Sequence, residues 1–571
     1  MGSDPERSAF SKIDRTVAAV NLTKFFAELK RRKVYAIAVG YLVGGWALAQ
    51  GIAQVLPVFD TPNWVIRLLV VLIILGFPVA LALSWFFDLT RYGIVRTPAL
   101  HEIDSALRSR SDEHSIAVLP FADLSPNRDH DYLSDGIAEE ILTALSKIDN
   151  LRVAARRSSF WFKDQRADLR EVARKLNVAH VLEGSVRRDE NRVRVTAELI
   201  DARGGFTIWS DTFEREMQSI FALQDDITHA IVDKLKLKLA ISAPSAARSP
   251  DAYDSYLQGL FYSDKSTEEE LRKSLRYFET ALAKDPRFAR AWTGIAKSWL
   301  WLADAYVAPL EAYSKVRDAA LKALKIDKSD AEAHVYLAET KRILDWNMDG
   351  AAREFTRAVE LDPKSTPSNY FSAAFWAALG EREDALKYLK RTATIDPASL
   401  WVNNAACELY RYFGLYDEAM AAGERSLQLD PAFVYGEPLL AALYREMGRF
   451  EEAIALYEKA QSLSGRPPFG LAITYAKMSR PEEARAMLAK VVAARGNYTP
   501  GDAIAHVYVA LGAHEDAIRE LERAANERSS SLHFVGIAPE FAPLRPDKRF
   551  VSIVERIGLD PKKVFAINPA S

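Results

Sequence analysis

Small residues recur at a fixed interval through the last part of this chain. Alanine stands at every thirty-fourth position over four copies, and shorter copies follow, so that the series runs Ala351, Ala385, Ala419, Ala453, Ala484 and Ala517. Twelve residues before five of these alanines lies another small side chain, at Ala373, Cys407, Ala441, Ala472 and Ala505. A period of about 20–50 residues indicates a solenoid, because each unit must stack on the next to bury its apolar face.

Each repeat unit also carries residues that predict a turn and the end of a helix. A glycine lies five residues before the alanine in four copies, at Gly380, Gly414, Gly448 and Gly512, and three units end on Asp-Pro, at Asp362-Pro363, Asp396-Pro397 and Asp430-Pro431. Proline does not fit a helix interior, and small residues let two helices approach closely. We therefore expect each unit to be a helix, a tight turn and a second helix. This pattern resembles the tetratricopeptide repeat.

The resemblance implies an all-α solenoid over residues 251–530, followed by a capping segment over 531–571. The first helix of each unit would line an inner wall, where an extended peptide or a partner helix lies. Counted from the small-residue register, the candidate peptide-binding positions are Tyr370, Trp401, Asn404, Glu408, Arg411, Tyr435 and Arg445. The aromatic rings there would contact apolar side chains of the partner. Asn404 would hydrogen-bond to a peptide backbone, and the arginines would pair with acidic groups. Packing between helices, or a solvated charge, is the alternative for each.

Two uncharged apolar stretches lie near the amino terminus. Residues 34–59 and 68–87 contain no Asp, Glu, Lys or Arg. The hydrocarbon core of a bilayer is spanned by about 20 helical residues, so both stretches are long enough to cross it. We expect a transmembrane hairpin over 34–88, with helices over 34–56 and 66–87.

Basic residues predict on which side of the membrane the two ends of this hairpin would lie. The run at 30–33 precedes the first stretch, and Arg91 and Arg96 follow the second. Positive residues favour the cytoplasmic side of a membrane. The expected arrangement is a basic cytoplasmic segment over 1–33, a linker over 89–114 and cytoplasmic soluble domains, in a multi-pass protein of a bacterial inner membrane.

Gly40 and Gly44 in the first apolar stretch have the GxxxG spacing. This spacing lets two helix backbones approach closely, so the pair is a candidate face for helix–helix association. The partners expected for this part of the chain are the lipid bilayer and a second copy of the chain. Close packing inside the hairpin is the alternative use of the two glycines.

The periodicity between these stretches and the repeats is that of a small α/β domain, expected over 115–240 with a linker over 241–250. Short apolar runs predict strands, spacing of three and four predicts helices, and alternation in "RVRVTAELI" predicts antiparallel hairpins. The segments "IAVLPFADLS", "YLSDGIAEEILTALSKI", "VLEGSVRR" and "IWSDTFER" resemble the TolB amino-terminal-like, or FlgO-like, domain of bacterial proteins.

The order of hairpin, α/β domain and repeats also resembles a bacterial family in which this portion is joined to varied amino-terminal modules. Those modules include class III adenylate or guanylate cyclases and winged-helix DNA-binding domains. Only residues 1–33 precede the first apolar stretch, so we expect neither module here.

Patterns that carry catalysis are scarce. No P-loop, GxGxxG, GxSxG, HExxH or Cys-x-x-Cys pattern occurs, and Cys407 falls on a small-residue position where packing explains it. Acidic residues beside His130 and His229 superficially resemble metal sets, with solvated charges as the simpler interpretation. The basic, aromatic run at 152–163 fits either an anionic surface or an intramolecular salt-bridge network. A net charge of -2 argues against nucleic acid.

The expected fold is therefore multidomain: a two-helix transmembrane hairpin, a small α/β domain and an all-α solenoid. The expected function is a non-catalytic, membrane-anchored scaffold, without cofactor or metal, that binds protein partners through the repeat groove in signalling or assembly. Two alternatives remain open. One is a regulatory or sensory component of a nucleotide-cyclase or transcription pathway, and the other is a periplasmic envelope-assembly factor.

Overall fold

The structure is a computed structural model that divides the chain into two units, Met1–Arg110 and Ser111–Ser571. It describes residues 87–90, 93–96 and 114–567, with gaps at 126–129, 147, 149–150, 164–167, 190–191, 203, 218–219, 236–248, 266, 304, 432, 434–435 and 495–497. In the first unit, β1 (Phe87–Thr90) and β2 (Gly93–Arg96) form an antiparallel pair at the start of the predicted linker.

The predicted location in a membrane needs correction. Within the described ranges, the structure contains no helix with both the length and the apolar character required to cross a bilayer. The multi-pass inner-membrane location is therefore not supported. Phe87, predicted to end the second spanning helix, instead begins a strand and pairs with Arg96. The rest of both predicted spans, and with them Gly40 and Gly44, lie outside the described residues.

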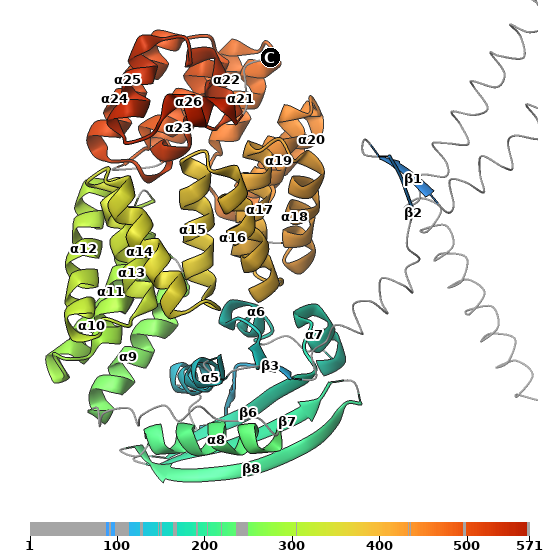
Figure 1. Ribbon diagram of the computed structural model, residues 1–571, viewed down its shortest axis with the longest axis vertical. Helices are drawn as coiled ribbons and strands as arrows, with labels where there is room; N and C mark the ends of the chain where they lie inside the picture. The colour runs from blue at the N-terminus through green and yellow to red at the C-terminus, as the bar shows by residue number, and fades with distance from the viewer. Residues whose placement is uncertain are drawn as a thin grey trace, which may run out of the picture. The chain divides into compact units, whose positions relative to one another are not determined.

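A six-stranded sheet organises the α/β domain of the second unit (Figure 1). Its strands are β3 (Ser115–Val118), β4 (Ala122–Asp123), β5 (Arg152–Val153), β6 (His180–Asp189), β7 (Arg192–Asp201) and β8 (Phe206–Glu216). The order is β5-β3-β6-β7-β8, and β4 pairs with β6. β3 is parallel to both of its neighbours, whereas β6, β7 and β8 are antiparallel, as the alternation in the sequence predicts.

Helices cover the two faces of this sheet unequally. Helices α5 (Asp131–Ser146) and α8 (Ile220–Lys234) share a buried apolar core with alternate residues of β6 and β7, including Leu182 and Val195. On the other face, the short α6 (Arg156–Phe160) and α7 (Leu169–Leu176) pack over Ala117 and Val181. These two short helices leave part of the sheet uncovered.

The repeats form eight successive helix pairs among the described residues. They are α9 (Pro250–Ser263) with α10 (Glu268–Lys284), α11 (Ala289–Leu302) with α12 (Pro309–Ile326), α13 (Ala331–Ile343) with α14 (Met348–Leu361), α15 (Thr366–Ala378) with α16 (Arg382–Ile395), α17 (Leu400–Tyr412) with α18 (Tyr416–Leu429), α19 (Gly436–Glu446) with α20 (Phe450–Ser464), α21 (Phe469–Lys477) with α22 (Pro481–Ala494), and α23 (Gly501–Ala510) with α24 (His514–Glu527). The alanines of the 34-residue register are fully buried between these helices.

Among the described residues, the turns inside six of the eight pairs contain a residue with a left-handed backbone. All four glycines that the sequence marks as turn residues have a positive φ: Gly380 (77°), Gly414 (68°), Gly448 (74°) and Gly512 (72°). Glycine adopts this conformation without the steric penalty of a β-carbon. Two other pairs place Trp346 and Ser479 at the same point of the turn, with φ of 51° and 60°. The repeat geometry therefore overrides the local preference of these two residues.

The segment after the last helix pair folds back on earlier repeats. It consists of two 3₁₀ helices, η3 (Ser530–Phe534) and η4 (Pro539–Leu544), followed by α25 (Lys548–Arg556) and α26 (Pro561–Ala566). The Lys563 ammonium lies 2.6 Å from the Glu381 carboxylate in the turn between α15 and α16. Phe534 stacks on Tyr412 of α17, with ring centroids 5.8 Å apart. The predicted cap thus covers more than the end of the array.

The α/β domain and the first repeats share a buried core. The carboxylate of Asp254 on α9 accepts hydrogen bonds from the Tyr132 hydroxyl (3.0 Å) and the Arg188 guanidinium (3.1 Å). Gln224 on α8 donates to the Tyr253 hydroxyl at 2.7 Å. These contacts join two parts of the chain that the sequence predicts as separate domains.

Candidate interaction groove

The predicted wall residues lie on the first helices of successive pairs. Tyr370 is on α15, Trp401, Asn404 and Glu408 are on α17, and all four are half-buried. Arg411, at the end of α17, is fully buried, as is Arg445 on α19. Tyr435 lies outside the described residues. The small-residue register thus places the described members on the expected helices but does not predict their burial.

An element of the α/β domain fills one end of the wall. The guanidinium of Arg157 on α6 lies 5.5 Å from the ring centroids of both Trp301 and Trp401. Those rings are themselves 5.1 Å apart. Stacking of a planar guanidinium on indole rings combines cation–π attraction with apolar contact. The first helices of the repeats therefore already hold a segment of their own chain at this end.

Further contacts fix α6 in place. Arg156 forms ion pairs with Glu139 of α5 (2.9 Å) and with Asp264, which follows α9. Ser158 donates a hydrogen bond to Asp396, the aspartate of a predicted Asp-Pro stop. Burial raises the pKa of Asp396 to about 6. The basic run at 152–163 thus contributes Arg156 to an intramolecular network, one of the two interpretations of its sequence.

The C-terminal segment fills the other end of the wall. The Glu540 carboxylate lies 2.8 Å from Arg411 and 3.1 Å from Arg445, and the exposed side-chain fractions of the three are 8%, 5% and 3%. Arg411 also pairs with Glu446, and Arg445 donates to the Tyr457 hydroxyl at 2.8 Å. Burial would raise the pKa of Glu540, but the charges of Arg411, His506 and Arg445 outweigh it and hold the pKa well below its usual range.

The middle of the wall includes one described side-chain atom, on Asn404, without such a partner. Asn404 Oδ1 is buried, and no donor among the described residues reaches it. One turn further along α17, Glu408 accepts a hydrogen bond from the Tyr412 hydroxyl at 3.1 Å, and burial raises the pKa of its carboxyl group. Buried acceptors in native proteins are nearly always hydrogen-bonded. Among the described wall residues, Asn404 thus has an acceptor with unused capacity to bind, and Arg411 Nε and Arg445 Nε are likewise buried without a hydrogen bond.

Sequence reasoning missed the two segments that occupy the ends of the wall. Neither α6 nor Glu540 belongs to the repeat register, and both reach the wall from distant parts of the chain. The signal available for α6 was the pair of adjacent arginines among aromatic residues. No local pattern distinguishes Glu540 from the other glutamates of the chain.

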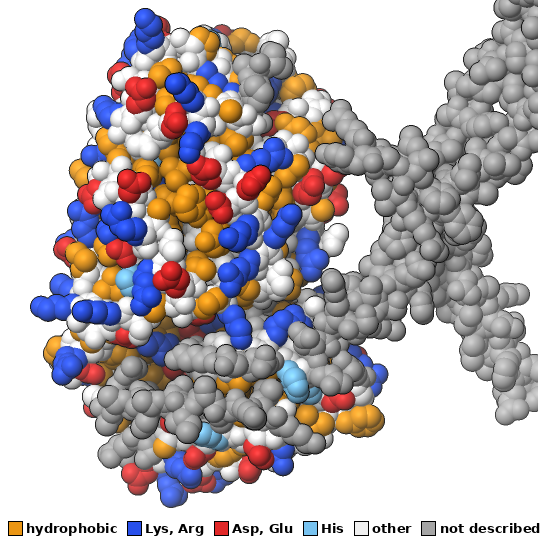
Figure 2. All heavy atoms as spheres, viewed as in Figure 1, with side chains coloured by type: hydrophobic (Ala, Val, Ile, Leu, Met, Phe, Trp, Pro, Cys, Tyr) orange, Lys and Arg blue, Asp and Glu red, His pale blue; other side chains and the backbone are white. Residues whose placement is uncertain are grey.

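Several charged groups outside the wall form ion pairs. No cluster of three or more His, Cys, Asp or Glu side chains suited to a metal ion occurs in the described part of the chain. Asp226, one of the acidic residues near His229, pairs with Arg215 at 2.8 Å. In Figure 2, basic and acidic side chains are interspersed over the repeat helices on the face shown.

The α/β domain and the repeats of the second unit match two different protein families. Residues 439–466 match a family described as tetratricopeptide repeat, and residues 111–230 match one described as "HilA/YgeH-like transcriptional regulator, second domain". The prediction of a tetratricopeptide solenoid is thus confirmed. The predicted likeness of the α/β domain to the TolB amino-terminal-like family is not shown.

Similar proteins cover only portions of the chain. A "putative adenylate cyclase 3" of Rhizobium meliloti (strain 1021) is 39% identical over 190 residues, which are 32% of each protein. The chain thus spans about a third of the length of this curated relative.

Two solved repeat proteins are similar to part of the chain. One, a thermophilic tetratricopeptide-repeat protein of Thermus thermophilus, is 23% identical and covers 32% of this chain and 92% of its own, with a TM-score of 0.27. The other, from Parabacteroides merdae ATCC 43184, is 14% identical and covers 47% and 100%, with a TM-score of 0.33. The repeat assignment rests on the matched family and on the helix pairs themselves.

Proposed function

We propose that this chain is a non-catalytic scaffold that binds a protein partner along the first helices of its tetratricopeptide repeats. The observation that carries the proposal is the buried, unpaired Oδ1 of Asn404 in the middle of the wall. An amide oxygen in this position is suited to accept a hydrogen bond from a backbone N–H of an extended segment. Repeats of this family bind proteins or peptides, which supports a partner of this class.

The rest of the wall favours particular side chains in that partner. Trp401, three residues before Asn404 on α17, and Tyr370 on α15 offer half-buried aromatic surface, and such surface accepts apolar side chains. Glu408 lies one turn from Asn404 and favours a basic group in the partner. Arg411 and Arg445 are engaged by glutamates of this chain, so the acidic partner expected from the sequence would have to compete with Glu540.

A site-specific photo-crosslinker tests the proposal in the full chain. Placed at Tyr370 on the wall, it should capture a discrete partner, whereas at Tyr388 on the second helix of the same pair it should not. Both residues are half-buried tyrosines, so the positions are matched. Capture at Tyr370 should fall in an Asn404→Ala variant that unfolds at the wild-type temperature. Equal capture at both positions, or capture unaffected by Asn404→Ala, would contradict binding along the wall.

A second candidate function is regulation within a nucleotide-cyclase or transcription pathway, with catalysis on a separate subunit. The partial likeness to a putative adenylate cyclase and to a transcriptional regulator's second domain favours it. The purified chain supplied with ATP and Mg²⁺ should then produce no cyclic nucleotide. Turnover that persists through stringent purification would contradict the non-catalytic proposal.

A further inference from the structure

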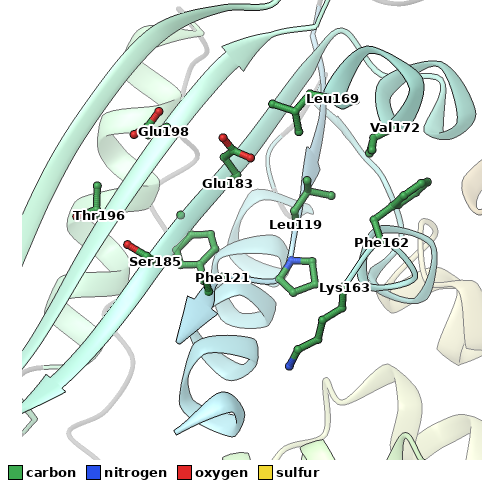
Figure 3. Close-up of a pocket in the computed structure, with 13 residues that line it drawn as sticks. Leu119, Phe121, Phe162, Lys163, Leu169, Val172, Glu183, Ser185, Thr196 and Glu198 are labelled. Atoms are coloured by element: carbon green, nitrogen blue, oxygen red, sulfur yellow. The ribbon is translucent and has the colours of Figure 1, made fainter. Parts of the chain in front are cut away.

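The α/β domain contains a cavity of about 430 Å³ on the sheet face that α6 and α7 only partly cover (Figure 3). Its floor is formed by β6 and β7, and its walls come from the segment after β3, the residues after α6, and helix α7. Cavities that bind small molecules typically enclose about 300–1,000 Å³. The volume is therefore in the range of a small organic ligand.

The floor of the cavity is polar and has two layers. Glu183 on β6 lies directly opposite Glu198 on β7, and in the next layer on the same face Ser185 lies opposite Thr196. Gly184 between them has no room for a side chain, because an added β-carbon would lie 2.4 Å from the Thr196 carbonyl oxygen. The strands thus present two carboxylates and two hydroxyl groups to one space.

Within the part of the chain that the structure describes, the two carboxylates have no counterion. Like charges directly opposite each other on antiparallel strands are destabilising. Among the described residues, neither the Glu183 nor the Glu198 carboxylate forms an ion pair or a hydrogen bond, and burial together with the charge of Glu198 raises the pKa of Glu183. By contrast, Arg194 on the same face of β7 pairs with Glu214 of β8 at 2.8 Å. No side chain that the structure describes neutralises the charge of the acidic pair.

The basic residue at the cavity does not meet that need. Lys163 lines the cavity, but its ammonium group lies 2.7 Å from the carboxylate of Asp135 on α5. Figure 3 shows its side chain pointing away from Glu183 and Glu198. The cation that balances the pair is therefore not supplied by this lysine.

The walls restrict what kind of cation fits. Leu119, Phe162, Leu169 and Val172 give the cavity an apolar lining beside the carboxylates. A metal ion would find only two carboxylate side chains and would leave most of this lining without contact. An ammonium group bearing an apolar body would satisfy both the floor and the walls, because its hydrogens suit carboxylate and hydroxyl acceptors.

We propose that this cavity binds a small organic cation, with its ammonium group between Glu183 and Glu198 and its apolar body against Phe162, Leu169 and Val172. The site is separate from the repeat wall and independent of the function proposed for it. Ser185 and Thr196 supply further hydrogen-bond acceptors at the floor.

Calorimetric titration of the full chain tests this site with three probes of equal length: n-hexylammonium, hexanoate and 1-hexanol. The ammonium probe should bind saturably, and the other two should bind at least tenfold more weakly. The Glu183→Gln/Glu198→Gln double variant should lose at least tenfold in affinity for hexylammonium. A Glu216→Gln control, which removes an exposed carboxylate from β8 outside the cavity, should leave the affinity unchanged.

Thermal unfolding provides the second measurement, in case a variant is poorly folded. Hexylammonium should raise the unfolding temperature of the wild-type and Glu216→Gln proteins and leave that of the double variant unchanged. The proposal is overturned if the wild-type chain does not bind hexylammonium, if hexanoate or hexanol binds equally well, or if a folded double variant keeps its affinity.

Discussion

Glu540 of the C-terminal segment lies 2.8 Å from Arg411 of α17, although 129 residues separate them in the chain. Both side chains are almost completely buried, and Arg445 contacts the same carboxylate oxygen. Two guanidinium groups from neighbouring repeats are thus neutralised in part by one residue of the segment that follows the repeats. The arginines predicted to line the groove therefore form ion pairs within this chain, and a partner would have to displace these contacts to bind them.

Replacing Glu540 with Gln should destabilise the protein strongly. Removing one charge of a buried pair leaves the other uncompensated and typically costs about 3–5 kcal/mol. Urea unfolding of the full chain measures the effect. Glu555→Gln, which alters an exposed glutamate of α25, should change the stability by no more than about 0.5 kcal/mol. Equal stability of the two variants would mean that the Glu540 contacts contribute nothing.

Two adjacent asparagines of α17 should respond in opposite ways to truncation. Asn403 donates hydrogen bonds to the carbonyl oxygens of Pro397 (3.1 Å) and Ser399 (2.8 Å), so Asn403→Ala should lower the stability by about 1–2 kcal/mol. Asn404→Ala removes a buried acceptor that has no donor and should leave the stability unchanged or higher. The unfolding midpoints of the two variants decide this, and a larger loss for Asn404→Ala would contradict the assignment of its amide oxygen.

Substitution of Arg157 should loosen the contact between α6 and the repeats. Arg157→Ala removes a guanidinium that faces two tryptophan rings, an interaction worth about 1–2 kcal/mol at a desolvated site. Arg157→Lys should restore only part of this, because an ammonium group cannot stack as a planar group does. Hydrogen exchange of the α6 amides reports the change. Arg174→Ala, on the exposed side of α7, should leave that exchange unaltered.

The pair formed by His334 and Glu354 should stabilise the protein most between about pH 4.5 and 6.5. The hydrogen bond from His334 (2.7 Å) and the nearby Lys341 outweigh burial and lower the pKa of Glu354 to about 2, so its stabilisation is lost as the pH falls toward 2. The same hydrogen bond raises the pKa of His334 above 6.5, so that its stabilisation is lost as the pH rises through the raised pKa.

The measurement is the difference in unfolding temperature between wild type and His334→Gln. It should be largest near pH 5.5 and should shrink as the pH rises through the raised pKa of His334. A difference that does not change with pH would show that the imidazolium charge has no part in the stabilisation.

The acidic pair of the cavity should make the unliganded domain less stable than it could be. Glu198→Gln removes repulsion between directly opposed charges and should raise the free energy of unfolding by about 0.2–1 kcal/mol. Chemical denaturation without added amines measures this, with Glu216→Gln as the matched control. A decrease in stability would mean that the charge of Glu198 has a favourable partner.

The sequence predicts the repeats well because their determinants are local. Ala385 and Gly380 specify close helix packing and a left-handed turn within one unit, and the same positions recur in other units. Trp346 shows the limit of this reasoning. It adopts a φ of 51° where the register calls for glycine, and the guanidinium of Arg528 lies 3.4 Å from its ring centroid. The packing of a later segment holds a turn that its own sequence disfavours.

Other parts of the structure depend on contacts that no local pattern encodes. Helix α5 begins at Asp131, and the preceding His130 amide donates to the Asp123 carboxylate at 2.8 Å. The occupation of the wall by α6 and Glu540 joins residues more than a hundred positions apart. The cavity arises from the register of β6 and β7, which sets Glu183 against Glu198.

The return of the C-terminal segment to earlier repeats changes how the array can come apart. In an open solenoid each unit touches only its neighbours, so the terminal units fray first and unfolding spreads inward. Here Lys563 forms an ion pair with Glu381 in the α15–α16 turn, and Phe534 stacks on Tyr412. Glu540 forms ion pairs with Arg411 of α17 and Arg445 of α19. The last repeats cannot detach without breaking contacts in the middle of the array. The consequence is that the repeats from α15 onward unfold as one cooperative unit.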